Sequence, residues 1–172
     1  MRTIKIQILL LAIFSCVFVF CGKNAEQDLN RASRHFEPDG KYSIHPPKAW
    51  KAAESPETKY KIIRGPKRKG IRQTMVFVDE ISNARMEDYV KDSIKNMEQD
   101  VQQTDFVTAK KLKAKKIVYS KMQSKRLMRI SHYILPGKGG VYMNIICTIV
   151  ADQEERYDKR FDDSVSTFEW EE

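Results

Sequence analysis

The second half of the chain contains long segments in which apolar and polar side chains alternate, and a period of two residues is the pattern of β-strands. Such segments occupy about residues 106–121, 125–135 and 141–150. The last two are joined by the glycine-rich segment 136–140, which is typical of a hairpin turn. Consecutive strands with short connections pair antiparallel, so these residues predict an antiparallel sheet at the centre of the fold.

Two segments with a helical period lie on either side of this strand region. One spans about residues 84–103, and the other follows the capping-box sequence 152–155. Their apolar stripes consist of Met86, Tyr89, Val90, Ile94, Met97 and Val101 in the first segment, and of Tyr157, Phe161, Val165 and Phe168 in the second. Earlier in the chain, residues 41–45, 59–64 and 72–79 read as strands. The order strands, helix, strands, helix predicts an α+β fold, in which a central mostly antiparallel β-sheet is flanked by two main helices as an α-β-α sandwich.

The first twenty residues differ in character from the rest of the chain. A basic start is followed by an apolar run of 16 residues that ends at Cys21, which is typical of a secretory signal. A helix needs roughly 20 residues to cross a bilayer, so the run favours a signal peptide over a permanent membrane span. We therefore expect a signal peptide at 1–20, a flexible polar tether at 22–40 and a single α+β domain at 41–172.

Two cysteines near the end of this run resemble the lipid acceptor of a bacterial lipoprotein. Cys16 follows Ser15, a small residue, and has the aliphatic Ile13 three positions before it. Cys21 follows the bulky Phe20, but it lies where the apolar run ends. Cleavage before either cysteine stays open. Acylation, as with palmitate, would anchor the domain to a membrane of the bacterial cell envelope on the exported side.

The sequence contains none of the common catalytic signatures. It has no glycine-rich phosphate loop, no zinc-protease helix and no hydrolase nucleophile elbow. Its histidines, His35, His45 and His132, fall in different segments, whereas a zinc site needs three or four converging ligands. Cys147 lies in a strand-like run and reads as a buried hydrophobic residue. We therefore expect no enzymatic activity, no cofactor and no metal. The alternative is a small-ligand carrier or an enzyme with a pocket between sheet and helix, using His132 or Cys147.

Positive and negative charges are separated along the chain, which carries a net charge of +8. Residues 106–151 hold ten basic and no acidic residues, and residues 59–72 hold seven basic and no acidic ones, while the acids gather in 79–105 and 152–172. One interpretation is that basic strands and acidic helices attract each other within the domain. The other is that the strands present a basic surface to an anionic partner. The candidate residues for such a surface are Lys67, Arg68, Lys69, Arg72, Lys113, Lys115, Lys125 and Arg126.

Anionic lipid headgroups are the nearest partner for such a surface. Each basic residue near an anionic membrane contributes about 1 kcal/mol, and a tether of about 20 residues reaches roughly 22–27 Å. The sequence therefore predicts a non-enzymatic, lipid-anchored envelope protein that binds an anionic surface or another envelope protein. A heparin-binding adhesin is a further alternative. Nucleic acid is disfavoured because an exported protein seldom meets it and no nucleic-acid motif is present. The oligomeric state stays open.

Several local features resemble the PsbP/Mog1/DcrB-like domains over roughly residues 40–172. They are the opening strand, proline and tryptophan at 42–50, the helix containing Tyr89, the hairpin near 137–142 and the terminal segment 164–170. The resemblance implies a central antiparallel sheet between helices. Members of the group include a photosystem accessory protein, a small-GTPase binder and bacterial envelope lipoproteins. The resemblance implies no catalytic residue, because the group shares none.

Overall fold

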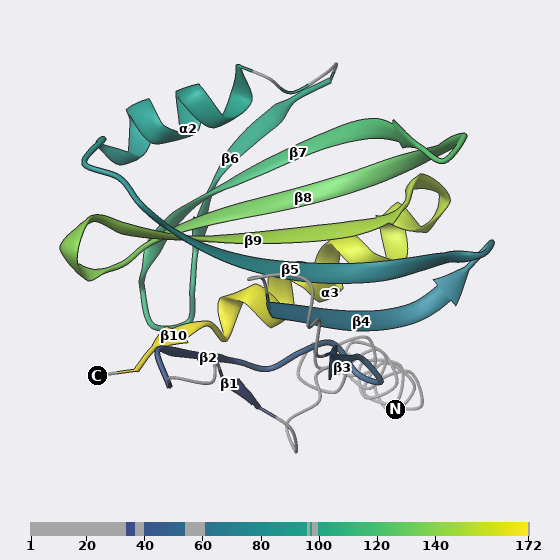
Figure 1. Ribbon diagram of the computed structural model, residues 1–172, viewed down its shortest axis with the longest axis horizontal. Coiled ribbons are helices and arrows are strands. Elements are labelled where there is room, and N and C mark those ends of the chain that lie inside the picture. Colours follow the sequence, from purple (N-terminus) through teal and green to yellow (C-terminus); the bar gives the residue numbers. More distant parts are fainter. Residues whose placement is uncertain (1–33, 37–39, 54–60, 96, 98–99, 172) are drawn as a thin grey trace, which may run out of the picture.

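The computed structural model describes residues 34–36, 40–53, 61–95, 97 and 100–171 (Figure 1). The predicted signal peptide, with Cys16 and Cys21, lies outside these residues, as does most of the predicted tether.

Seven strands form one antiparallel sheet in the order β3-β4-β5-β9-β8-β7-β6. Their bounds are β3 (Lys51–Ala53), β4 (Lys61–Arg68), β5 (Ile71–Ile81), β6 (Gln102–Val107), β7 (Lys113–Gln123), β8 (Arg126–Pro136) and β9 (Val141–Val150). Two α-helices, α2 (Met86–Ile94) and α3 (Glu154–Ser166), accompany the sheet. The predicted fold class, a mostly antiparallel sheet with two main helices, is confirmed.

The two faces of the sheet pack against different helices, because successive side chains of a strand point to opposite faces. One face carries the larger core cluster, which includes the apolar stripe of α3: Ile63, Met75, Phe77, Tyr133, Ile145, Cys147, Tyr157, Phe161, Val165 and Phe168. The other face packs against α2 through Tyr89, Val90, Ile117, Ile134 and Tyr142. Both predicted apolar stripes therefore face the sheet.

Two element boundaries differ from the sequence prediction. The segment expected as one strand at 106–121 contains the end of β6, a turn and most of β7. The turn has Lys111 at a φ of +62° and a hydrogen bond from its amide to the carbonyl of Thr108. It contains no glycine or proline, so the sequence gives no turn signal there. The helix expected at 84–103 ends earlier, and its last two predicted residues pair with β7 as the start of β6.

A second sheet of three short strands covers the edge of the core beside α3. It consists of β1 (His35–Phe36), β2 (Tyr42–Ile44) and β10 (Glu169–Trp170), with β2 in the middle. Arg34 forms an ion pair of 2.9 Å with Glu169, so ordered contacts extend into the range predicted as tether. None of the helices in the described part of the chain combines the length and apolarity needed to span a bilayer.

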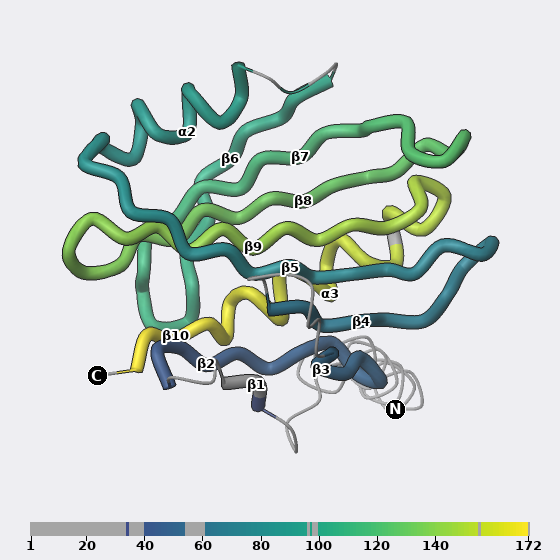
Figure 2. The backbone as a smooth tube through the Cα atoms, viewed as in Figure 1, coloured from purple at the N-terminus to yellow at the C-terminus, as the bar shows by residue number. Residues whose placement is uncertain are grey.

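Two 3₁₀ turns complete the fold. One, η2 (Lys138–Gly140), joins β8 to β9 as the predicted hairpin connection. The other, η3 (Ala151–Gln153), joins β9 to α3. Figure 2 shows that the β4–β5 hairpin, the β7–β8 hairpin and the β9–α3 connection lie at one end of the molecule, on the right, while η2 lies at the opposite end.

Candidate functional site

Six of the eight basic residues predicted to meet an anionic surface lie at one end of the sheet. The β4–β5 hairpin turns at residues 69–70 and the β7–β8 hairpin turns at 124–125. Thr74 of β5 is opposite Thr148 of β9, and Met128 of β8 is opposite Val150 of β9. Because both hairpin turns lie next to this end of β9, they are at the same end of the sheet (Figure 2). We call this the basic end, and it carries Lys67, Arg68, Lys69, Arg72, Lys125 and Arg126.

Lysines occupy the turns of both hairpins in a left-handed backbone conformation. Lys69 and Gly70 have φ values of +48° and +81°, and Ser124 and Lys125 have +49° and +60°. Two consecutive positive φ angles are the mark of type I′ turns, which suit the twist of a hairpin and favour asparagine and glycine. A lysine in this region costs free energy that glycine would not. The turns therefore present charge at positions where the backbone alone would favour another residue.

Lys113 and Lys115 lie at the other end of the sheet. They are at the start of β7, where Lys113 is opposite Val107 of β6. The ammonium of Lys115 donates a hydrogen bond of 2.6 Å to Asp105 on the neighbouring strand, and this bond lowers the pKa of Asp105. These two residues are thus separated from the basic end by the length of the sheet.

A cavity of about 440 Å³ opens beside the basic end, at the edge formed by β3, β4 and the first turns of α3. Seven basic residues line it: Lys48, Lys51, Arg64, Arg68, Arg72, Arg156 and Arg160. The described residues that line it include no aspartate or glutamate. We call it the cationic cavity.

Buried aromatic side chains form the wall of the cationic cavity. Trp50 and Tyr157 are each 1% exposed, and their rings lie 6.0 Å apart. Gly65 allows the indole of Trp50 to pack directly on the β4 backbone, because a Cβ at this position would lie 2.4 Å from Trp50 Cε2. The guanidinium of Arg72 donates a hydrogen bond of 3.4 Å to the carbonyl of Gly65. The wall is therefore rigid, and one of its arginines is held by the backbone.

Lys69 of the basic end is paired within the domain. Its ammonium forms an ion pair with Asp152 in the β9–α3 connection, and the hydrogen bond from Lys69 lowers the pKa of Asp152. The side chain of Asp152 consequently faces the hairpin, and the predicted capping box does not form: α3 begins without a side-chain cap.

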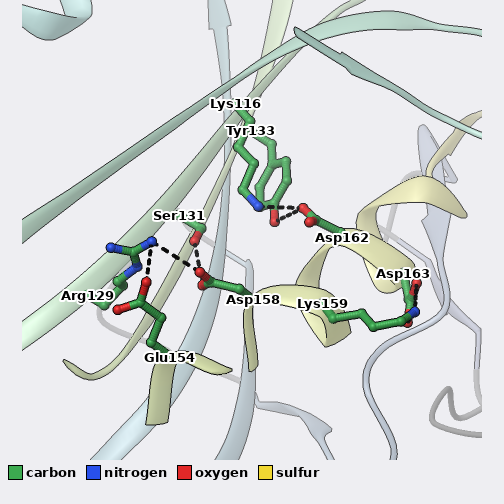
Figure 3. Close-up of polar contacts among 9 residues, drawn as sticks. All are labelled: Lys116, Arg129, Ser131, Tyr133, Glu154, Asp158, Lys159, Asp162 and Asp163. Atoms are coloured by element: carbon green, nitrogen blue, oxygen red, sulfur yellow. Dashed lines mark hydrogen bonds and ion pairs between the residues drawn. The ribbon is translucent and has the colours of Figure 1, made fainter. Parts of the chain in front are cut away.

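Two basic strand residues outside this end, Arg129 and Lys116, meet acids of α3, as the first interpretation of the charge pattern predicts (Figure 3). Arg129 contacts Glu154 at 2.7 Å and Asp158 at 3.1 Å, and Lys116 contacts Asp162 at 2.7 Å. These ion pairs and hydrogen bonds join the sheet to α3 through Lys116, Arg129, Ser131, Tyr133, Glu154, Asp158 and Asp162. Internal pairing therefore accounts for these strand charges, but not for the cationic cavity.

His132 and Cys147 do not form a reactive site. The Nε2–H of His132 donates a hydrogen bond of 2.8 Å to Asn144, whose amide donates to the hydroxyl of Tyr89, which donates in turn to Glu80. Burial lowers the pKa of His132, and burial with the Glu80 hydrogen bond raises the pKa of Tyr89 to about 12. Cys147 is fully buried and burial raises its pKa far above the ordinary value. Neither His132 nor Cys147 lines the cationic cavity.

Two further cavities lie at the other end of the molecule. One, of about 450 Å³, has an apolar floor that includes Phe77 and Met143 and a rim with Lys61, Asp79 and Glu171. The other, of similar volume, lies near the β6–β7 turn. His132 and Cys147 are absent from both. Within the described part of the chain, no three His, Cys, Asp or Glu side chains are grouped as a metal site would require.

The basic end also carries an exposed apolar pair that sequence reasoning missed. Met122 and Leu127 face each other across the β7–β8 hairpin, and they are 60% and 49% exposed. They flank Lys125 and Arg126 at the tip. Periodicity hides them, since an apolar residue in an alternating strand reads as core. The sequence offered one signal of their exposure, which is that both residues lie close to a two-residue turn.

No protein-family model matches the sequence, and no curated protein matches it. Solved structures do match the fold. LpqN, involved in cell envelope biogenesis of Mycobacterium tuberculosis, aligns with a TM-score of 0.60 and 12% identity over 81% of this chain and 90% of its own. Cyanobacterial PsbP from Synechocystis aligns with a TM-score of 0.57 and 12% identity over 88% and 97% of the two chains.

The Ran-binding protein Mog1p of Saccharomyces cerevisiae aligns with a TM-score of 0.53 and 9% identity over 80% of this chain and 94% of its own. A structure from Bacteroides thetaiotaomicron aligns with a TM-score of 0.58 and 13% identity over 81% of this chain, which spans only 48% of that longer chain. Identities this low show the fold alone. The chain therefore has the PsbP/Mog1-like α+β fold that its sequence predicted.

Proposed function

We propose that this chain is a non-enzymatic, lipid-anchored protein of the bacterial cell envelope whose domain binds an anionic membrane surface through the basic end. The observation that carries the proposal is the β7–β8 hairpin, where the exposed Met122–Leu127 pair lies beside Lys125 and Arg126. Basic residues are attracted to anionic headgroups, and exposed apolar side chains beside them can enter the boundary of the acyl region. A soluble polyanion offers no apolar region for the exposed Met122–Leu127 pair to contact, whereas a membrane does.

Most basic side chains of the basic end are not neutralised by acids in the described part of the domain and can therefore bind an anionic membrane. Among the described residues, the side chains that form no ion pair there are Lys67, Arg68, Arg72, Lys125 and Arg126. At about 1 kcal/mol each, they contribute at most about 5 kcal/mol before salt screening. Such an attraction is weak for a free protein but effective for a domain that a tether already holds beside the bilayer.

The N-terminal sequence and one structural neighbour support the envelope location. The signal-like residues 1–20 with Cys16 and Cys21 supply the lipid anchor in this proposal, and residues 22–33 supply the link to the first described residues. LpqN, which shares the fold, is itself involved in cell envelope biogenesis.

Lysine labelling tests this proposal on the full chain reconstituted in vesicles. Amine-reactive labelling is compared on phosphatidylcholine vesicles and on vesicles that also contain phosphatidylglycerol. We expect Lys67 and Lys125 to be protected on the anionic vesicles, while Lys113 at the other end serves as an internal control. High salt should remove the protection because it screens exposed charges. Equal labelling of Lys67 and Lys125 on both kinds of vesicle would refute surface binding.

A pair of variants tests the apolar contribution separately. Met122→Ser with Leu127→Ser should reduce the protection, because it removes the apolar contact and keeps all charges. Ile81→Ser is the matched control, since Ile81 is 79% exposed and lies at the opposite end of β5. If the two variants behave alike, the hairpin does not enter the membrane boundary.

A further inference from the structure

We infer that the cationic cavity is a binding site for a single phosphoryl group, carried either by a lipid headgroup or by a soluble phosphate compound. The inference rests on the proposed function in that it names the ligand chemistry of the basic end. The cavity, of about 440 Å³, falls in the size range of small-molecule sites.

The composition of the cavity favours phosphate over other anions. Five of its seven basic side chains are arginines. The planar guanidinium offers paired N–H donors that match the oxygens of a phosphate group, whereas a lysine acts as a point charge. A single carboxylate would offset only one of these charges. A dianionic tetrahedral phosphate group can accept hydrogen bonds from several guanidinium groups at once. It therefore fits a cavity that has many cationic donors and no acid among its described lining residues.

Three arginines of the cavity are not matched by acidic side chains within the described part of the domain. Arg64, Arg68 and Arg72 form no ion pair among the described residues, in contrast to Arg129 on β8 and Lys116 on β7. Three guanidinium groups near one another without an acid repel each other. Stability alone would favour neutral residues here, so the charges point to a ligand.

The first turns of α3 bring two further guanidinium groups to the cavity. Arg156 and Arg160 are four residues apart, and both lie over the ring of Tyr157, at 5.7 and 5.6 Å from its centroid. Like charges at this spacing destabilise a helix. The buried ring of Tyr157 holds both guanidinium groups at the cavity. A bound anion would replace their repulsion by attraction.

Phosphate titration of the full chain in nonionic detergent tests the inference. Thermal unfolding and calorimetry are measured with inorganic phosphate and glycerol phosphate, against chloride at equal ionic strength. A ligand that binds only the folded state raises the unfolding temperature, so both phosphates should raise it. Arg64→Gln with Arg72→Gln should weaken phosphate binding by at least about tenfold, since two charge-assisted contacts are lost.

The same variant separates a binding role from a structural one. Without phosphate, Arg64→Gln with Arg72→Gln should unfold at about the same temperature as the wild type, because the repulsion that is removed offsets the loss of the 3.4 Å hydrogen bond from Arg72 to Gly65. Lys113→Gln with Lys138→Gln removes two charges at the other end and should leave phosphate binding unchanged. No effect of phosphate on the wild type, or equal phosphate binding by wild type and arginine variant, would overturn the inference.

A competition experiment in micelles of detergent and anionic lipid distinguishes the two sources of the phosphoryl group. If phosphatidic acid in the micelles, whose headgroup is a phosphate monoester, competes with inorganic phosphate, the ligand is a lipid headgroup; if it does not, the ligand is a soluble phosphate compound. A different outcome would refute the proposed function. Phosphate binding without protection of Lys67 and Lys125 on anionic vesicles would leave the site standing and refute surface binding. Protection without any phosphate effect would refute the site alone.

Discussion

The contact between Gly65 and Trp50 provides a sharp test of how the cationic cavity is built. In a Gly65→Ala variant the new Cβ would lie 2.4, 2.6 and 2.8 Å from three atoms of the indole. Backbone conformation is not the obstacle, because the φ of Gly65 lies outside the left-handed region. The indole must move, and at 1% exposure any shift disturbs its packing against the rings of Tyr157 and Phe161.

The expected cost follows from two limits. Overpacking a core by a methyl group typically costs about 1–3 kcal/mol. Full expulsion of the indole would cost about 6 kcal/mol, since a tryptophan buries up to about 250 Å² at about 25 cal/mol per Å². We therefore expect Gly65→Ala to lower the free energy of unfolding by about 3 kcal/mol. The displaced indole should also weaken phosphate binding at the cavity.

A double-mutant cycle in chemical denaturation measures this contact. In a Trp50→Leu background the space for the methyl group exists, so Gly65→Ala should cost less than about 1 kcal/mol there, leaving a coupling energy of about 2 kcal/mol or more. Gly70→Ala is the control for backbone strain, because Gly70 has a φ of +81° and open space around it; it should cost about 1–2 kcal/mol in both backgrounds. A Gly65→Ala cost that is equal in both backgrounds would refute the packing argument.

Three further predictions follow from the anchor, the ion pairs and the buried histidine. Intact-mass measurement of the membrane-bound protein should show a lipid-modified N-terminal cysteine, and only one of Cys16→Ala and Cys21→Ala should abolish it; an unmodified N-terminus in the wild type would contradict the anchor. Arg129→Met should lower the free energy of unfolding by about 1–2 kcal/mol in denaturant titrations, because it leaves two partly exposed carboxylates of α3 without their partner; no loss would mean that these pairs are only superficial. Because burial lowers the pKa of His132 below its ordinary 6.5, the unfolded chain binds a proton that the folded one does not, so stability should fall as the pH drops below about 6.5. A His132→Gln variant should flatten this part of the stability profile, and an unchanged slope would show that other groups cause it.

Much of the fold could be predicted because it depends on local periodicity. The stripe Tyr157, Phe161, Val165 and Phe168 is buried against the sheet as its spacing predicted. The hairpin at 136–140 carried glycine signals and was found. The turn at residues 108–111 was missed because it achieves its left-handed position with Lys111 instead of glycine.

The site could be predicted only in part because it joins distant segments. Arg64, Arg68 and Arg72 belong to the basic run at 59–72, and Arg68 and Arg72 were named as candidates from it, whereas Lys48 and Arg156 gave no signal of their own. They reach one cavity only through the pairing of β3 with β4 and the return of α3 along the sheet. The same limit applied to Lys113 and Lys115: a charge run cannot tell which end of a sheet it occupies until the hairpin turns are known.

Energy transfer from tryptophan to a fluorescent headgroup tests the central claim most directly, because the two tryptophans of the chain mark its two ends. Trp50 lies at the cationic cavity, and Trp170 donates a hydrogen bond of 2.9 Å to the carbonyl of Pro136 at the other end. Trp170→Phe and Trp50→Phe chains are each placed in phosphatidylglycerol-containing vesicles with dansyl-labelled lipid. We predict stronger transfer from Trp50 than from Trp170, and loss of the difference at about 1 M salt, where the Debye length is about 3 Å. Equal transfer from both, stronger transfer from Trp170, or a difference that salt does not alter would contradict binding through the basic end.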